Sequence, residues 1–218
     1  MKSLKFNNRD FFIYQNDLPS NINFGNSIAV DTETTGLSLV RDRLCLIQIS
    51  SGDNNCHIIK FDVDFFKNNK SPTNLVTLLT NKKIEKIFHF ARFDLAIIKK
   101  FLKIKCENIF CTKIASRLVR TYTDKHGLRE LCKELLDIDL NKSQQSSDWS
   151  SEILSENQLK YAASDVLYLA SIKKKLLVML KREGRIELAL RIFEFLDTRI
   201  ELDILGWDNQ DIFSHSLK

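Results

Sequence analysis

Proline and glycine are scarce in this chain, at two and six of its 218 residues. The sequence contains no Pro-, Gly- or Ser-rich linker, no internal repeat and no low-complexity tract. These absences leave no mark of a boundary between domains. Because a chain of this length is long enough to bury a large core, we expect one α/β domain.

The five cysteines are odd in number and form no Cys-x-x-Cys pair. This spacing argues against a disulfide framework and against a structural zinc site. We expect the cysteines to be small, buried, reduced side chains of a protein in a reducing compartment. The N-terminus lacks an apolar run of signal-peptide length, and no apolar run reaches the length of about 18 residues that a membrane span needs. We therefore expect a cytoplasmic protein with no membrane partner.

Charge is close to balanced, with a formal net charge of +5. Its 44% hydrophobic and 28% charged residues are ordinary for a soluble globular protein. The positive excess mildly favours an anionic partner such as nucleic acid. Lysine clusters such as 99–100 and 173–175 are more often solvated helix faces than binding patches. Composition alone therefore does not decide the partner.

Apolar β-type runs alternate with turns in the first half of the chain, and helical patterns follow. The runs predict strands at 27–30, 44–50, 56–61, 84–90 and 108–111. Helices are predicted at 72–79, 92–101, 128–136, 155–182 and 186–196. Ser155 and Gln158 fit a capping box at the start of the long helix. This order of elements predicts a mixed sheet with helices packed around it.

Two acids, Asp31 and Glu33, close the apolar run 28–30 and precede a turn at Gly36. Residues two apart on a strand share one face, and two such carboxylates repel each other unless a cation lies between them. An Asp-x-Glu pattern arises about once by chance in a chain of this composition. Its position adds weight, because open α/β sheets usually bind ligands at the carboxyl ends of their strands.

Further candidates lie in two later segments. Asp94 falls in the first turn of the predicted helix 92–101, where acids commonly stabilise the helix terminus. Tyr161 and Asp165 are four apart on a helix and share one face. Each has a structural explanation when taken singly. Together the segments supply four carboxylates that suit Mg²⁺ or Mn²⁺, and two such ions can clamp the oxygens of a phosphate displacement.

These motifs, in this order, resemble those of the DEDD 3′–5′ exonucleases, in the subgroup with a tyrosine in the third motif. Asp31 and Glu33 match the first motif, Asp94 the second, and Tyr161 with Asp165 the third. The intervening stretches are similar to the nanoRNase C family, compact relatives of ribonuclease D. The likeness starts at about residue 28 and includes residues 42–45, 86–90, 110–116, 120–124, 144–149 and 205–207.

The resemblance implies an RNase H-like mixed sheet flanked by helices, in a single exonuclease domain over 1–218. Its core would lie at about 25–183, with a C-terminal helix and tail at 184–218. It further implies two-metal hydrolysis of very short RNA, especially dinucleotides, to 5′-mononucleotides by a homo-octamer. Asp31, Glu33, Asp94 and Asp165 would hold two divalent cations, Mg²⁺ or Mn²⁺. Tyr161 would position the attacking water.

Four more residues are candidates for substrate contact. Leu37 follows the glycine turn and either wedges between two bases or simply packs. His89 and Arg92 lie close to the second motif and either contact phosphate or hydrogen-bond within the fold. Trp149, in a polar stretch, either stacks near the substrate or packs in the interior or at a subunit interface.

Alternative functions stay open. A ribonuclease D-like trimmer of longer RNA 3′ ends would use the same chemistry. The short stretch after Asp165 favours small substrates, because it leaves no room for the extra helical domains of longer ribonucleases D. A nucleic-acid-binding or assembly protein without chemistry is disfavoured because all five motif positions are filled. DNA ends stay open as substrates, since no reader of the 2′-hydroxyl is identifiable. A DNA proofreading domain is less favoured because no polymerase is attached.

Overall fold

The computed structural model describes residues 2–6, 9–140, 144 and 147–215. Gln145 and Ser146, which belong to one stretch of the family resemblance, lie outside the described residues. The strands are β1 (Lys2–Phe6), β2 (Arg9–Gln15), β3 (Ser27–Thr34), β4 (Leu44–Ser50), β5 (Cys56–Lys60), β6 (Glu85–Phe88) and β7 (Ile109–Cys111). The helices are α1 (Thr73–Thr80), α2 (Ala91–Leu102), α3 (Thr112–Val119), α4 (Leu128–Leu136), α5 (Glu156–Leu167), α6 (Leu169–Arg182), α7 (Ile186–Leu202) and the π-helical C-terminal turn η1 (Asp203–Trp207).

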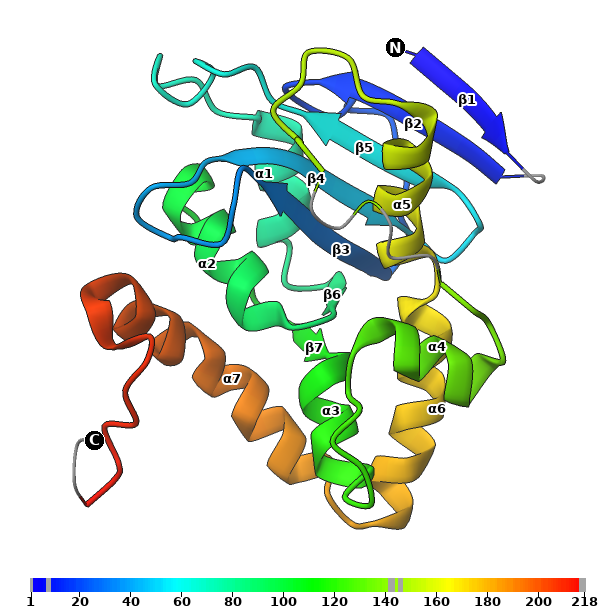
Figure 1. Ribbon diagram of the computed structural model, residues 1–218, viewed down its shortest axis with the longest axis vertical. Helices are drawn as coiled ribbons and strands as arrows, with labels where there is room; N and C mark the ends of the chain where they lie inside the picture. The colour runs from blue at the N-terminus through cyan, green and yellow to red at the C-terminus, as the bar shows by residue number, and fades with distance from the viewer. Residues whose placement is uncertain (1, 7–8, 141–143, 145–146, 216–218) are drawn as a thin grey trace.

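The strands with described positions form one sheet in the order β1-β2-β5-β4-β3-β6-β7. Strand β4 pairs antiparallel with both β3 and β5, whereas β2–β5, β3–β6 and β6–β7 are parallel pairs. In Figure 1, α5 crosses one face of the sheet and α1 lies behind the other, while α3, α4, α6 and α7 gather at one end. The predicted α/β fold, a mixed sheet flanked by helices, is confirmed.

Strand β3 is longer than the apolar run that predicted it. It continues through Thr34 and pairs with β4 from Ala29 to Thr34, with a register shift after Glu33. Asp31 and Glu33 therefore lie within the strand rather than beyond its end. The backbone ladder does not depend on side-chain polarity, so an apolar run marks only the part of a strand that faces the core.

The predicted helix 155–182 is two helices, α5 and α6, that meet at Tyr168 (φ −103°, ψ −9°). Apolar periodicity continues across the break, and neither proline nor glycine marks it. The predicted capping box is confirmed: the Ser155 hydroxyl accepts from the backbone N–H of Gln158 at 3.2 Å, and the backbone N–H of Ser155 donates to Oε1 of Gln158 at 2.9 Å. The predicted helix 186–196 also extends further, to Leu202.

The hairpin β1–β2 was not predicted from sequence, and α3 lies in the region of helical pattern for which no helix bounds were predicted. Strand β2 joins the sheet through parallel pairing with β5, so the sheet begins well before residue 25. Helix α3 follows β7 without a loop.

The five cysteines are free thiols, and all except Cys106 are buried. Across the described ranges, no helix combines the length and apolarity that a membrane crossing requires.

Candidate active site

Three carboxylates converge from two elements of the fold. Asp31 and Glu33 on β3 and Asp165 on α5 each offer an oxygen, and these oxygens lie within 4.8 Å of one another. Helix α5 packs across β3, β4 and β5 and buries Ala162 and Ala163 completely. These small side chains let the helix approach the sheet closely, which brings Asp165 to the acids of β3.

Asp94, in the first turn of α2, is tied to the same strand. Its side chain is buried, and Oδ1 accepts hydrogen bonds from the backbone N–H of Thr32 at 3.1 Å and from the Thr32 hydroxyl at 2.8 Å. Thr32 lies between the two acids of β3. These bonds fix the start of α2 against the strand and hold Asp94 beside the cluster. No sequence pattern marked Thr32, because a threonine is an ordinary strand residue.

The negative charges of the four acidic side chains repel one another. Burial, followed by the charges of Asp94, Asp165 and Glu33, raises the pKa of Asp31 well above its usual value. Burial and the neighbouring acids raise the pKa of Glu33 to about 9. Burial also raises the pKa of Asp94 to about 7, although the hydrogen bonds from Thr32 oppose the shift. Carboxylates this close require protons or a cation between them, and hard oxygen ligands fit a divalent cation.

Tyr161 lies one helical turn before Asp165 and forms a side-chain hydrogen bond with it. Burial, reinforced by the acids, raises the pKa of Tyr161, so the phenol stays protonated and keeps its O–H as a donor. The Trp149 ring lies 6.0 Å from the Tyr161 ring and is only 3% exposed. Trp149 therefore supports the tyrosine as a wall of the site.

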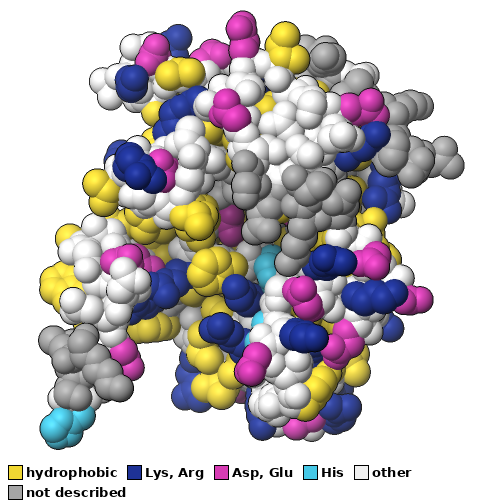
Figure 2. Space-filling view, viewed as in Figure 1, with side chains coloured by type: hydrophobic (Ala, Val, Ile, Leu, Met, Phe, Trp, Pro, Cys, Tyr) yellow, Lys and Arg dark blue, Asp and Glu magenta, His cyan; other side chains and the backbone are white. Residues whose placement is uncertain are grey.

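A cleft of about 700 Å³ opens over the acids. Besides the five motif residues, its lining includes Thr32, Leu37, His89, Phe90, Phe93, Lys113, Arg129, Leu140, Ser147 and Trp149. In Figure 2, acidic, histidine and basic side chains meet in the middle of one face, and Lys and Arg side chains alternate with Asp and Glu over the lower part. The cleft thus has an acidic floor and two basic side chains, Lys113 and Arg129, in its lining, an arrangement suited to metal ions and a phosphate-bearing ligand.

Comparison with known proteins agrees with this geometry. The 3′–5′ exonuclease family model matches residues 15–181. The solved structure of Brucella melitensis NrnC bound to pGG is 50% identical, with a TM-score of 0.89, and the match covers 94% of this chain and 98% of that one. This chain is a member of the nanoRNase C family of 3′–5′ exonucleases.

The chain is also similar to a second NrnC structure and to a ribonuclease D. The structure of Brucella melitensis NrnC with bound Mg²⁺ is 49% identical with a TM-score of 0.88, over 94% of this chain and 99% of that one. Ribonuclease D of Gluconacetobacter diazotrophicus is 32% identical over 160 residues. That match covers 73% of this chain but only 39% of the ribonuclease D, so the chain spans well under half of that relative. The predicted ribonuclease D-like exonuclease family is confirmed.

The other candidate residues of this nanoRNase C member differ in whether they line the cleft. His89 lines the cleft, with Nδ1 at 2.9 Å from the hydroxyl of Thr112. Arg92 does not contribute to the lining of this cleft. Its guanidinium donates to both carboxylate oxygens of Asp203, at 2.5 and 2.7 Å, and to the carbonyl of Asp208 at 2.7 Å. Arg92 thus fastens the C-terminal turn to α2.

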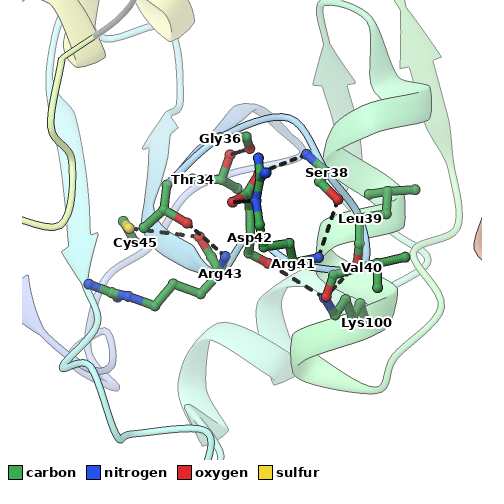
Figure 3. A network of polar contacts seen from close by, with 11 residues as sticks. Thr34, Gly36, Ser38, Leu39, Val40, Arg41, Asp42, Arg43, Cys45 and Lys100 are labelled. Carbon is green, nitrogen blue, oxygen red and sulfur yellow. Dashed lines mark hydrogen bonds and ion pairs between the residues drawn. The ribbon is translucent and has the colours of Figure 1, made fainter.

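Leu37 stands at the cleft with 83% of its surface exposed. Figure 3 shows that the loop that carries it is held by Asp42 within the loop and by Lys100 of α2. Asp42 accepts from the N–H of Ser38 at 2.8 Å, and Lys100 donates to the carbonyl of Val40 at 3.1 Å. A Cβ atom on Gly36 would overlap the Asp42 carboxylate, so any other residue there would have to push aside the side chain that accepts from the Ser38 N–H.

We predict that Gly36→Ala lowers kcat/KM by about 10–100-fold, because displacement of a positioning loop by about 1 Å has effects of this size. If the loop acts through Leu37, the double variant Gly36→Ala/Leu37→Ala should be no worse than Leu37→Ala alone. Steady-state kinetics on a short RNA measures this cycle. Fully additive losses would contradict a role for the loop in presenting Leu37.

Lys113 is a cleft residue that the sequence patterns did not single out. Its Nζ lies 4.2 Å from the centre of the Phe90 ring. Burial, together with the charge of Arg117, lowers the pKa of Lys113. Basic residues are frequent throughout this chain, so only the fold distinguishes a lysine in the cleft from one on a solvated surface.

Proposed function

We propose that this chain is a metal-dependent 3′–5′ exoribonuclease that hydrolyses very short RNA, especially dinucleotides, to 5′-mononucleotides. The observation that carries the proposal is the set of three carboxylates whose oxygens lie within 4.8 Å at the floor of the cleft. The pGG-bound and Mg²⁺-bound structures of NrnC support it. The cleft volume, about 700 Å³, is within the range of sites that enclose small ligands, which also favours a substrate of few nucleotides.

Asp31, Glu33, Asp94 and Asp165 are the residues that would hold two divalent cations, Mg²⁺ or Mn²⁺. When bound, such ions neutralise the charge that develops on the phosphate during displacement. The protein contributes rigid ligands: Asp31 and Glu33 are fixed by the β3–β4 ladder, and Asp94 by its bonds from Thr32. His89, Leu37 and Trp149 would contact or border the substrate, whereas Arg92 would act through the C-terminal turn.

Tyr161 would orient the attacking water for in-line attack on phosphorus. Its protonated hydroxyl is held by Asp165, next to the cluster. We predict that Tyr161→Phe lowers kcat by about 10²–10⁴-fold, the range typical of a positioned proton-bearing group. KM should change little.

The matched control is Tyr168→Phe, which removes a hydroxyl that accepts from Arg9 at 3.0 Å and lies outside the cleft lining. Single-turnover rates of the two variants measure the difference. A Tyr161→Phe variant as fast as Tyr168→Phe would contradict this role for Tyr161.

A ribonuclease D-like trimming of longer RNA is the second candidate. The similarity to the ribonuclease D of Gluconacetobacter diazotrophicus favours it, although this chain spans only 39% of that protein. The chemistry would be the same, and only the preferred substrate length would differ. DNA ends are tested by offering DNA of the same sequence as the RNA.

We further propose that residues 1–218 act as a single exonuclease domain. The core predicted at about 25–183 is extended at its start by β2, and the C-terminal helix and tail at 184–218 follow it. A homo-octamer is the expected assembly. The exposed side chains of Leu205, Trp207 and Phe213 in the tail support a contact between copies. We place the protein in the cytoplasm, because free thiols suit a reducing compartment. Light scattering measures the assembly directly.

The activity is tested with a 5′-labelled RNA of seven nucleotides incubated with Mg²⁺, with Mn²⁺ or with EDTA. The proposal predicts products shortened one nucleotide at a time from the 3′ end, and no products with EDTA. Internal cuts, or cleavage that persists with EDTA, would contradict the proposed mechanism. The absence of cleavage under all conditions would favour a nucleic-acid-binding protein without chemistry.

A further inference from the structure

Gln48, in the middle of β4, is a buried polar residue without an evident partner. Its side chain is completely buried, and within the described residues neither its amide nitrogen nor its amide oxygen has a hydrogen-bond partner. An unsatisfied buried amide destabilises a fold, and such groups are rare in native proteins. All the residues of β4 are buried, so an apolar side chain would suit the position better for stability alone.

The sheet register places Gln48 directly beside the acidic cluster. Gln48 is the partner of Asp31 across the antiparallel pair β3–β4. Residues in such positions project from the same face, with Cβ atoms about 4.5–5.5 Å apart. On the other side of Gln48, the paired residue is Ile58 of β5, whose side chain offers no hydrogen-bonding group. Along this row of the sheet, Asp31 is therefore the polar neighbour of Gln48.

The same face is covered by α5, which packs on β3, β4 and β5 and carries Asp165. Helix α5 meets the sheet with Ala162 and Ala163. Alanine side chains carry no polar atoms, so they supply no partner for the amide. Ser50, two residues along β4 on the same face, differs from Gln48 because its hydroxyl accepts from the N–H of Gly52 at 3.3 Å.

We propose that Gln48 is a positioning residue for Asp31: in the metal-loaded protein its amide donates a hydrogen bond to the Asp31 carboxylate and fixes its orientation. The inference rests on the proposed function. A carboxylate that binds a metal through one oxygen is commonly held by a hydrogen bond to the other. A neutral amide suits this task because it donates without adding positive charge. A lysine or arginine at this position would compete with the cations for the acids.

The test is Gln48→Leu, which keeps the approximate shape and removes the amide. Gln48→Met is a second variant in case the branched side chain does not fit. Calorimetric titration with Mn²⁺ should show affinity weakened by about 10–100-fold, the usual effect of removing a group that orients a metal ligand. The Mg²⁺ concentration for half-maximal cleavage should rise by a similar factor. In EDTA, the Tm of the variant should equal or exceed that of the wild type.

The matched control is Ser50→Ala, which removes a buried polar group from the same strand and face. It should keep the Mn²⁺ affinity within twofold of the wild type. Wild-type Mn²⁺ affinity in a folded Gln48→Leu or Gln48→Met variant would overturn the role of Gln48, even if the cleavage rate fell. A wild-type protein that neither binds Mn²⁺ nor cleaves RNA would instead overturn the proposed function, so the two failures are distinguishable.

Discussion

An Asp31→Asn variant is expected to cleave RNA at least about a thousandfold more slowly than the wild type, a barrier increase of about 4 kcal/mol. Asp31 lies in the cluster with Glu33 and Asp165 and also interacts electrostatically with Asp94, so its charge acts on all the other acids. Replacing it with the isosteric amide removes a proposed metal ligand without opening a cavity. In metal-free buffer the variant should be as stable as the wild type or more stable, because repulsion within the cluster is relieved.

A large loss of cleavage rate without a loss of stability distinguishes a functional acid from a structural one. The matched control is Asp64→Asn, which alters an exposed acid whose carboxylate pairs with Lys67 at 3.0 Å. Single-turnover cleavage with saturating Mg²⁺ gives the rate, and a thermal melt in EDTA gives the stability. An Asp31→Asn rate within tenfold of the control would contradict the assignment of Asp31 as a metal ligand.

The metal-free protein is expected to lose stability as the pH rises from about 5 to about 9. The pKa of Asp94 is about 7 and that of Glu33 about 9 in the folded protein, whereas unfolded carboxyls titrate near 4. Between these values the folded state binds more protons than the unfolded state, so the free energy of unfolding falls with rising pH. The contribution of these two groups to the free energy of unfolding is complete below about pH 4, and it is lost as the pH rises past about 7 and then about 9.

Divalent cations should reverse this loss, because they take the place of the protons between the acids. At about a hundred times Kd, Mg²⁺ should stabilise the protein at pH 8 by about 3 kcal/mol. For a chain of this length that corresponds to a rise in Tm of about 5–10 °C.

Glu33→Gln is the informative variant for the pH experiment. It should flatten the pH dependence above about pH 7 and abolish most of the Mg²⁺-induced rise in Tm. Thermal melts across pH, with EDTA or Mg²⁺, measure both effects. A wild-type Tm that increased from pH 6 to pH 9 in EDTA would contradict the electrostatic account of the cluster.

The positions of the candidate acids were predictable from sequence, but their neighbours were not. Spacing shows that Asp31 and Glu33 share a face of a strand, and that Tyr161 and Asp165 share a face of a helix. It does not show which strand lies alongside or in which register. The pairing of Asp31 with Gln48 therefore required the structure. The hydrogen bonds between Thr32 and Asp94 also join segments whose approach no local pattern encodes.

Fold prediction succeeded where local signals were strong. Strand β4 and helix α4 have the predicted bounds, because each is a periodic or apolar segment between clear turn signals. The break at Tyr168 lacks a proline or glycine to signal it, and the hairpin β1–β2 mixes charged and aromatic residues without a long apolar run. The position of Arg92 suggested a substrate contact, but its side chain pairs with Asp203, from the distant C-terminal turn.

Preference for very short RNA is the central claim, and a time course on 5′-labelled RNAs of two, three, seven and twenty nucleotides tests it most directly. Each RNA is incubated at the same concentration with Mg²⁺ or Mn²⁺, beside an Asp31→Ala control that should be inactive. The proposal predicts that the dinucleotide is cleaved far faster than the RNA of twenty nucleotides. Equal or faster cleavage of the long RNA would contradict the claim and identify a ribonuclease D-like trimmer.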